Sequence, residues 1–360
     1  MRIGLFSPYL PEHFGGGEKY ILDVARLWAK DHDVEVGIAN LDISQAASIR
    51  QKYERFLGQP LDKVTFVSCP LHTPASWLQK ILWTKKYDVL FYVTDGSQFF
   101  SLAGRNILHI QIPFTAPLSA FDRLKMKNWT YRTANSEFTR QVVSESWKIP
   151  IQFVQPPMIA KDAFQETTRK EKVILSVGRF FRQLHSKRQD VLVEVFAKLL
   201  QQEPELLKGW KMVFVGAAED PEFAKEVQTK AEGLPVEFYH DLDREGLLAW
   251  YQKARIYLHS AGFGVDQKQH PEQVEHFGIS TAEAMASGAI PVVVGKGGQP
   301  MVVGPAFQEY MWQTQEECVM KTVQLLKEQT NWSTLALQAQ HQASTFDQTQ
   351  FEVHLAELLQ

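Results

Sequence analysis

Two acidic residues, Glu275 and Glu283, flank a Phe-Gly turn in the segment EHFGISTAEAMASG. A carboxylate can accept two hydrogen bonds at once, which suits it to a pair of neighbouring hydroxyl groups. A helix is expected to open near Ser280, where its free amides and dipole would attract an anion beside the second acid. Ser280 and Glu283 also fit the Ser-x-x-Glu pattern of a capping box. Glu283 could therefore bind a ligand or only close the helix.

A second group of residues places cations beside a glycine. Gly178 and Arg179 end an expected strand, and Lys187 and Arg188 precede the next expected helix. Fixed cations can neutralise the charge that develops on a departing anionic group, without a metal ion. Lys187 is preferred as the second cation, and Arg188 is its rival because the intervening loop is long. The alternative is an exposed, solvated basic loop.

The front half of the chain offers weaker signals. Gly16 and Gly17 follow the first expected strand, and glycines let a backbone approach a ligand closely. A plain flexible turn is the alternative. His109 and Gln111 lie at the end of another expected strand and share one face by strand alternation, so either could contact a ligand. A buried histidine with satisfied hydrogen bonds is equally compatible with the pattern.

Two further groups could suggest a metal, but no metal site is expected. Asp241 and Asp243 have the Asp-x-Asp form of some metal sites, although a surface turn explains them better. His270, Glu272 and His276 belong to a long polar loop without a fixed helical pair of ligands. This loop is expected to lie on the substrate side of the site.

Together these motifs resemble the family 4 glycosyltransferases, the retaining members of the glycosyl transferases group 1. The family signature is Glu-x7-Glu with the Phe-Gly and Glu-Ala-Met-Ala-x-Gly context found here. The resemblance implies that Glu275 and the amides of the Phe277-Gly278 turn face the sugar of a nucleotide sugar donor, and that Glu283 holds the ribose. It also implies that Arg179 and Lys187 neutralise the diphosphate as it leaves. No cofactor is implied beyond the donor substrate.

The same resemblance assigns the remaining site residues. Many relatives carry a histidine two residues before a proline at this strand end, whereas this chain has Gln111 before Pro113. The residues expected in catalysis are Glu275, Arg179, Lys187 and His109. The residues expected to bind the donor are Gly16, Gly17, Gln111, Gly178, Phe277, Gly278, Ile279 and Glu283.

The elements that must position these residues follow an alternating pattern. Short runs rich in Val, Ile and Phe alternate with stretches of helical period, which predicts parallel sheets built from βαβ units. The pattern occurs twice, on either side of an irregular segment, Gln155–Lys172, that is typical of a linker. The strands expected in the first half are 3–7, 34–39, 64–68, 89–93, 107–111 and 133–135. Those expected in the second half are 173–177, 212–215, 236–239, 256–259 and 290–294.

The predicted fold is therefore α/β, with two Rossmann-like domains facing across a cleft, the GT-B arrangement that the resemblance also implies. Residues 1–160 would form the acceptor-side domain, joined by a C-terminal helix at about 345–360 that crosses back to it. Residues 161–344 would bind the nucleotide sugar. Ligands of such sheets bind beyond the carboxyl ends of the strands.

The composition of the chain makes some classes of binding partner and some cellular locations less compatible than others. The chain has 360 residues and a formal net charge of -3, which argues against a nucleic-acid partner. Residues 1–150 carry about +4 and the rest about -7. Only Cys69 and Cys318 are present, which fits a reducing cytoplasm. No apolar run reaches the roughly 20 residues that span a bilayer.

The segment Ser76–Lys86 combines aromatic and basic residues at helical spacing in the basic half. Such a face could contact an anionic membrane that carries a lipid-linked acceptor, although a helix packed on the core with a solvated lysine edge is more common.

Three functions remain compatible with the sequence. The first is transfer of a sugar to a glycan, lipid-linked or small-molecule acceptor. The second is a nucleotide-sugar epimerase or a phosphorylase on the same fold. The third is a catalytically silent glycan-binding subunit, against which the presence of both acids and both cations argues.

Overall fold

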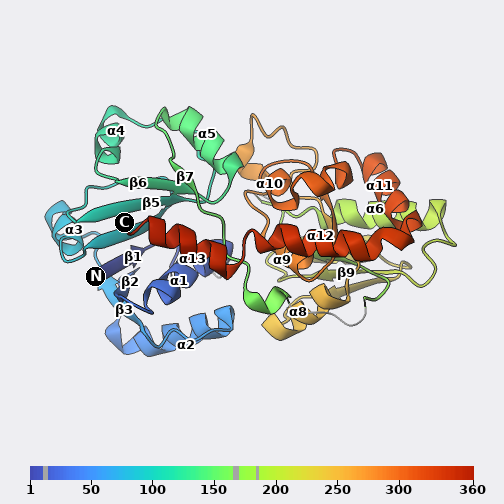
Figure 1. The fold of residues 1–360 in the computed structure, drawn as a ribbon, viewed down its shortest axis with the longest axis horizontal. Helices are drawn as coiled ribbons and strands as arrows, with labels where there is room; N and C mark the ends of the chain where they lie inside the picture. The colour runs from blue at the N-terminus through green and yellow to red at the C-terminus, as the bar shows by residue number, and fades with distance from the viewer. Residues whose placement is uncertain (11–14, 165–169, 184–185) are drawn as a thin grey trace. The chain divides into compact units, whose positions relative to one another are not determined.

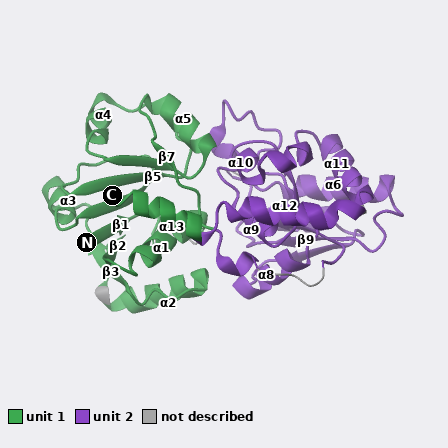
Figure 2. Cartoon of the chain, viewed as in Figure 1, with its two compact units in different colours: residues 1–158, 349–360 green, residues 159–348 purple. Residues whose placement is uncertain are grey.

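The structure, a computed structural model, describes residues 1–10, 15–164, 170–183 and 186–360. The chain divides into two compact units (Figure 2). Unit 1 comprises Met1–Met158 and Thr349–Gln360, and unit 2 comprises Ile159–Gln348. Part of the expected linker, residues 165–169, lies outside the described residues.

Unit 1 is built on a parallel sheet that has seven strands among the described residues, in the order β3-β2-β1-β4-β5-β6-β7 (Figure 1). The register pairs Ile3 with Val34 and with Val89. The strands are β1 Arg2–Phe6, β2 Asp33–Ala39, β3 Val64–Cys69, β4 Val89–Thr94, β5 Arg105–Ile110, β6 Tyr131–Ala134 and β7 Phe153–Val154. The helices are α1 Gly16–Trp28, α2 Ala46–Leu57, α3 Trp77–Thr84, α4 Ala120–Met126, α5 Glu137–Trp147 and α13 Gln348–Glu357.

Helices cover both faces of this sheet because successive strand residues point to opposite sides. On one face, Ile3 and Phe91 pack with the apolar side chains of α1, α2 and α13. On the other face, Leu90 and Tyr92 pack with α5 and the end of α4. The final helix belongs to the first core, since Phe351 lies edge-on to a tyrosine of α1 at 5.6 Å. The expectation that the chain's end returns to the first half is confirmed.

Unit 2 repeats the architecture with a parallel sheet of six described strands in the order β10-β9-β8-β11-β12-β13. The strands are β8 Val173–Val177, β9 Lys211–Val215, β10 Val236–Tyr239, β11 Ile256–His259, β12 Ile290–Val294 and β13 Met311–Trp312. The helices are α6 Gln189–Gln202, α7 Pro221–Lys230, α8 Arg244–Lys253, α9 Ile279–Ala286, α10 Gln299–Val303, α11 Gln315–Lys327 and α12 Trp332–Ser344. Ile174 and Met212 pack with α6, α7 and α11, while Leu175 and Val213 pack with Tyr251 of α8.

The predicted α/β class with two parallel sheets is confirmed. The expected strands all form, within two residues of their predicted ends. Two edge strands, β7 and β13, were not predicted because each has only two residues, too few for a hydrophobic pattern. Among the described residues, no helix is both long and apolar enough to cross a bilayer.

Candidate active site

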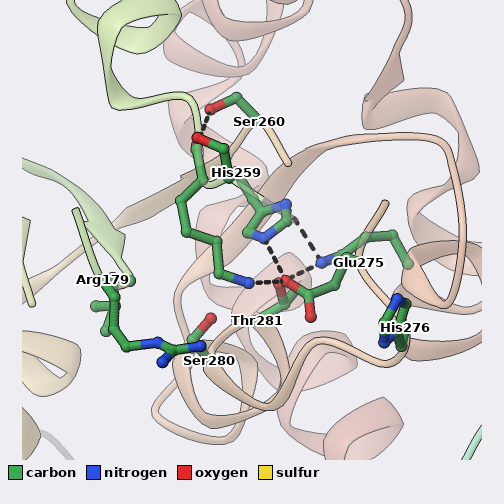
Figure 3. Close-up of polar contacts among 12 residues, drawn as sticks. Arg179, His259, Ser260, Glu275, His276, Ser280 and Thr281 are labelled. Atoms are coloured by element: carbon green, nitrogen blue, oxygen red, sulfur yellow. Dashed lines mark hydrogen bonds and ion pairs between the residues drawn. The ribbon is translucent and has the colours of Figure 1, made fainter. Parts of the chain in front are cut away.

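The centre of the site in unit 2 is the carboxylate of Glu275, in the loop before α9. His259, the last residue of β11, places its Nε2 atom 2.9 Å from the Glu275 carboxylate. The ammonium group of Lys187 pairs with the same carboxylate oxygen. Figure 3 shows His259 beside Glu275. All three side chains are mostly buried. The structure therefore brings together two predicted residues, Glu275 and Lys187, and adds His259.

The contact with Gln299 indicates which ring nitrogen of His259 carries the proton. The Gln299 side-chain amide lies 3.3 Å from Nδ1 of His259 and donates to the Thr281 hydroxyl at 3.0 Å. An amide NH₂ group can only donate, so Nδ1 accepts and Nε2 carries the proton toward Glu275. Burial lowers the pKa of His259, although its contact with Glu275 opposes that shift. A neutral His259 thus holds the Glu275 carboxylate in place.

The position of Lys187 depends on Gly178 at the end of β8. A Cβ atom at Gly178 would lie 2.6 Å from Cγ of Lys187, closer than real contacts allow. The Ser260 hydroxyl donates to the carbonyl oxygens of Lys187 and Arg188, at 2.6 and 3.0 Å. The Arg188 guanidinium turns to Asp190 at 3.0 Å instead. The two rival cations therefore have different surroundings, and only Lys187 contacts Glu275. Residues 184 and 185 of this loop lie outside the described residues.

Arg179 follows Gly178, but its ion pair is with Glu219 and not with Glu275. Its guanidinium lies 3.0 Å from the Glu219 carboxylate and 4.9 Å from the centre of the Phe181 ring. The side chain is substantially exposed. Its role with a leaving diphosphate stays a prediction.

Helix α9 begins one residue before Ser280, and the capping-box interpretation of Glu283 is wrong. The N-cap is Gly278, with φ of 113°, so Ile279 is the first helical residue. The Ser280 hydroxyl accepts from Tyr257 at 2.8 Å. Glu283 lies beyond the third helical position, which a capping-box acid would occupy. The positive φ restricts position 278 to glycine, and so does the Gln299 amide, which would lie 2.7 Å from a Cβ atom there.

Glu283 is instead held by an ion-pair network. Arg244, the first residue of α8, donates to the Glu283 carboxylate at 2.7 Å and to Asp162 at 2.8 Å and 3.1 Å. Burial works against the charge of Arg244, but the two acids outweigh it and raise the pKa of the guanidinium. The contact with Arg244 uses the Oε1 atom of Glu283. Sequence reasoning missed Arg244, which reaches the acid from a separate helix.

The Phe277 side chain is buried and lies edge-on to Phe346 at 5.2 Å. It belongs to the core, so its contribution to a site can only come from the backbone, as the resemblance implied. The next loop supports this turn, since the Gly298 amide donates to the Glu275 carbonyl at 2.7 Å. A Cβ atom at Gly297 would lie 2.1 Å from that carbonyl oxygen. The Gly-Gly loop therefore fixes the backbone at Glu275.

The polar loop at residues 265–276, which contains the three candidate metal ligands, also contacts the Gly-Gly loop. The Gln267 side chain accepts from the Gly297 amide at 2.8 Å, and Lys296 donates to the Val265 carbonyl at 2.6 Å. His270 lies 3.4 Å from Glu272. Among the described residues, no three His, Cys, Asp or Glu side chains gather as they would around a metal ion.

The Asp-x-Asp pair also has a structural explanation. Asp243 is the N-cap of α8, and its carboxylate accepts from the Gly246 amide at 2.9 Å. Asp241 is exposed in the preceding turn. This geometry matches the surface-turn interpretation.

The residues predicted in unit 1 form a separate group. Gly16 and Gly17 open α1, while residues 11–14 of their loop lie outside the described residues. A Cβ atom at Gly17 would lie 2.7 Å from the side-chain oxygen of Gln111, so this partly exposed glutamine lies against the start of α1. Gln111 and Gly17 are thus neighbours, as a shared binding surface requires.

His109 has a different environment from Gln111. It is fully buried, its Nδ1 atom lies 2.8 Å from the Thr133 hydroxyl, and its ring stacks on Tyr20 with a centroid distance of 4.0 Å. Burial lowers the pKa of His109 to about 3. Its Nε2 atom has no hydrogen-bond partner in the described part of the chain. The burial and stacking match the alternative of a buried histidine, but among the described residues only one of its two ring nitrogens has a hydrogen-bond partner. A catalytic role for His109 stays a prediction.

Comparison with known proteins places this site in a family. The family model "Glycosyl transferases group 1" matches residues 159–339, half of the chain and all of the site in unit 2. The chain belongs to the glycosyl transferases group 1. The match includes Arg179, Lys187, Glu275 and Glu283.

One curated relative is the GDP-Man:Man(3)GlcNAc(2)-PP-Dol alpha-1,2-mannosyltransferase of Neurospora crassa. It is 30% identical over 164 residues, which are 41% of this chain and 27% of that protein. The chain thus matches about a quarter of the length of this relative.

Among solved structures, HepE of Anabaena in complex with UDP and glucose aligns over 100% of this chain and 99% of its own, with a TM-score of 0.69 and 17% identity. A glycosyltransferase of Rickettsia africae aligns over 100% and 98%, with a TM-score of 0.73 and 14% identity. At these identities the likeness shows the fold alone, which is the GT-B fold.

Proposed function

We propose that this chain is a retaining, metal-independent hexosyltransferase of family 4, which moves a sugar from a nucleoside diphosphate donor to a hydroxyl group. The observation that carries the proposal is the contact of Lys187 and His259 with Glu275, directly before the N-terminus of α9. An acid held by a cation and a neutral donor, beside free helix amides, suits a sugar whose leaving group is an anion.

In this proposal the donor diphosphate lies at the start of α9. The amides of the first turn of α9, which begins at Ile279, are directed along the helix axis toward it, and the dipole of α9 adds positive potential. The Lys187 ammonium has three donors, so it can keep its pair with Glu275 and still contact a phosphate oxygen. Arg179, which is exposed and paired through a surface contact with Glu219, supplies the second cation.

The two acids take different parts of the donor. Glu275 accepts from the sugar hydroxyls, because its carboxylate is oriented by His259 and Lys187. Glu283 accepts from the ribose with the carboxylate that Arg244 orients. Both carboxylates therefore bind hydroxyl groups, and neither is needed as a base.

The transfer step follows from this arrangement. The bond between the anomeric carbon and the phosphate oxygen breaks, and its electron pair leaves with the nucleoside diphosphate. The acceptor oxygen bonds to the anomeric carbon on the same face, and its proton passes to the leaving phosphate oxygen. Lys187 and Arg179 stabilise the negative charge that grows on the diphosphate, which is the role that a metal would otherwise fill.

The acceptor is a glycan, a lipid-linked glycan or a small molecule. The name of the Neurospora relative describes transfer to a dolichol diphosphate-linked glycan, which favours the lipid-linked class. The same name gives a GDP-sugar, whereas HepE is described with UDP, so both bases are candidates. The cysteines Cys69 and Cys318 are buried free thiols, which fits action in the cytoplasm. A lipid-linked acceptor would place this action at the inner face of the membrane.

A screen of UDP-, GDP- and ADP-sugars tests the proposal. A ligand at 100 times its dissociation constant stabilises the folded protein by about 2.7 kcal/mol, so the true donor raises the melting temperature. The donor is then incubated with the protein in EDTA, and release of nucleoside diphosphate is measured. Interconversion of the sugar would indicate an epimerase, and cleavage that requires inorganic phosphate would indicate a phosphorylase. Binding without any turnover, even with candidate acceptors, would indicate the silent subunit.

A further inference from the structure

Large apolar side chains are exposed on two helices of unit 1. On α3, Trp77 is 72% exposed, and Leu78 and Leu82 are each half exposed. On α4, Phe121 is 60% exposed and Leu124 about half exposed. Single apolar residues on a surface are ordinary, but a gathered set marks an interaction site.

The loop between β4 and β5 joins the two helices. The Leu102 amide donates to the Thr84 hydroxyl at the end of α3, at 2.8 Å. Two residues earlier, the Phe100 ring lies edge-on to Phe121 of α4 at 5.9 Å. Leu102 is itself half exposed. Figure 1 shows α3 and α4 at the same end of the unit 1 sheet. We call Trp77, Leu78, Leu82, Leu102, Phe121 and Leu124 the apolar surface.

Neither helix needs these side chains for its own packing. Helix α3 is held by its inner side, where the Trp83 ring lies 5.0 Å from that of Tyr87. Thr84 is the buried residue of α3, and Met126 is the buried residue of α4. The expectation of a helix packed on the core with a solvated lysine edge therefore describes only the inner side of α3. Its outer side presents tryptophan and leucine to solvent.

Cations surround the apolar surface. Lys80 and Lys85 belong to α3 and its end, and Arg123 and Lys127 to α4 and its end. In the described part of the chain, none of these four forms an ion pair. The segment Ser76–Tyr87 contains no acid at all, and the one acid of α4, Asp122, is paired with Lys125 at 2.8 Å. The surroundings of the apolar surface are therefore positively charged.

We infer that the apolar surface and its four cations form a docking site for an anionic lipid bilayer. Tryptophan, phenylalanine and leucine can enter the boundary between headgroups and acyl chains, while lysine and arginine contact anionic headgroups. Charge complementarity selects this occupant, because a neutral protein groove would leave the unpaired cations without partners. The inference concerns unit 1 alone and does not depend on sugar transfer by unit 2. It would bring the enzyme to the surface where a lipid-linked acceptor is embedded.

Sedimentation of the full chain with vesicles tests this inference. The protein is mixed with vesicles of phosphatidylcholine containing about 30% phosphatidylserine, or of phosphatidylcholine alone. Binding is expected to the anionic vesicles and to fall as salt is raised, because salt screens the headgroup charge. Trp77→Ser and Phe121→Ser should each weaken binding at least about tenfold, by analogy with the burial of a large side chain.

Charge variants give a second measurement that does not disturb apolar packing. Lys80→Gln, Lys85→Gln and Arg123→Gln should each weaken binding about fivefold, as expected for one basic residue at an anionic surface. Leu337→Ser is the matched control, because Leu337 is a similarly exposed apolar residue, 65% exposed, on α12 of unit 2. It should bind vesicles like the wild type. Circular dichroism melting confirms that each variant is folded.

Two results would overturn the inference. One is the absence of wild-type binding to anionic vesicles at low salt. The other is equal binding by Trp77→Ser, the charge variants and the Leu337→Ser control. Concentration-dependent self-association of the wild type without lipid, abolished by Trp77→Ser, would assign the surface to a second copy of the chain and would also contradict a lipid partner. Donor binding by unit 2 can succeed or fail independently of each of these results.

Discussion

Glu283 is the residue at which a ligand-binding role and a purely structural role can be separated. Its pair with Arg244 is mostly buried, and Arg244 is also held by Asp162. Glu283→Gln removes the charge that would accept from the ribose, so we expect the affinity for the nucleoside diphosphate to fall about ten- to 150-fold, from a charge-assisted contact of about 1.5–3 kcal/mol. Because the variant also weakens the pair with Arg244, its melting temperature should fall. Calorimetry measures the affinity.

Asp162→Asn is the control for Glu283→Gln. It disturbs the same network from the other side of Arg244, at a residue that would not contact the donor. It should lower the melting temperature while the nucleoside diphosphate binds as to the wild type. Equal loss of affinity in both variants would mean that the network only supports the fold.

The buried histidines give the protein a defined acid sensitivity. Burial lowers the pKa of His109 to about 3 and also lowers the pKa of His259. In the unfolded chain these histidines have a pKa of about 6.5, so below this pH they bind protons that the folded chain does not bind. Their burial therefore costs no stability above about pH 6.5, and the free energy of unfolding decreases as the pH falls below this value. Because of His109 alone, the free energy of unfolding should be about 2 kcal/mol lower at pH 5 than at pH 7.

His109→Gln tests this assignment. The variant loses the stacking on Tyr20 and should be less stable at pH 7, but its stability should fall less steeply between pH 7 and pH 5. His341→Gln, at an exposed histidine of α12, should keep the wild-type slope. Urea denaturation at both pH values measures the free energy of unfolding. An unchanged slope together with lost turnover would instead support a catalytic His109.

At the scale of elements, the Gly-Gly loop before α10 controls the backbone at Glu275. Gly297 has φ of 61°, and a Cβ atom there would overlap the Glu275 carbonyl. Gly297→Ala should therefore destabilise the protein by more than about 3 kcal/mol and reduce turnover, because both strain and overlap must be relieved. Thermal melting and donor cleavage are the measurements.

Gly264→Ala is a matched control for Gly297→Ala. Its φ of 76° is similar, but nothing lies within 4 Å of a Cβ atom there. It should cost only about 1–2 kcal/mol, the usual strain of a positive φ, with turnover retained. Similar effects of the two variants would mean that the overlap with Glu275 is relieved without consequence.

The sequence pattern predicted the helices and strands well, but it predicted few of the contacts among side chains. Buried parallel strands such as β8 and β11 are mainly apolar and are fully or almost fully buried, and the sequence displays such runs directly. The start of α9 was predicted to within one residue, but the Ser-x-x-Glu pattern wrongly suggested a capping box, because the N-cap is Gly278 and not Ser280. For α3 the sequence left two alternatives open, a helix packed on the core and an exposed apolar face, because periodicity does not tell which apolar side is covered.

The same limit applies to the site. Glu275 and Lys187 were predicted as functional residues because both fall in motifs that resemble those of the family. His259 and Arg244 were missed, because a histidine that ends an apolar strand and an arginine that begins a helix are common core and surface residues. Their importance follows only from tertiary distances of 2.9 and 2.7 Å to the two acids. A histidine at the carboxyl end of a central strand was the one available signal.

At the scale of the whole molecule, we expect activity without a divalent metal. Arg179 and Lys187 would stabilise the diphosphate, so EDTA should leave the rate of donor cleavage unchanged, and added magnesium or manganese should not raise it. Arg179→Ala should lower the rate about ten- to 150-fold while the fold is kept. Loss of activity in EDTA that manganese restores would contradict this, and would direct attention to Asp241 and Asp243.

The most direct test of sugar transfer at this site is the release of nucleoside diphosphate from the donor by three proteins: the wild type, Glu275→Gln and Glu272→Gln. Gln at position 275 can still accept from His259, so the fold should be kept, but it loses the charge paired with Lys187. Glu272→Gln changes a more exposed acid of the neighbouring loop. We predict that Glu275→Gln cleaves the donor at least about 100-fold more slowly, a loss of about 2.7 kcal/mol of transition-state stabilisation, and binds the free nucleoside diphosphate like the wild type. Glu272→Gln should cleave it normally. Equal cleavage by all three proteins, or no cleavage of any nucleotide sugar by the wild type, would contradict sugar transfer at Glu275.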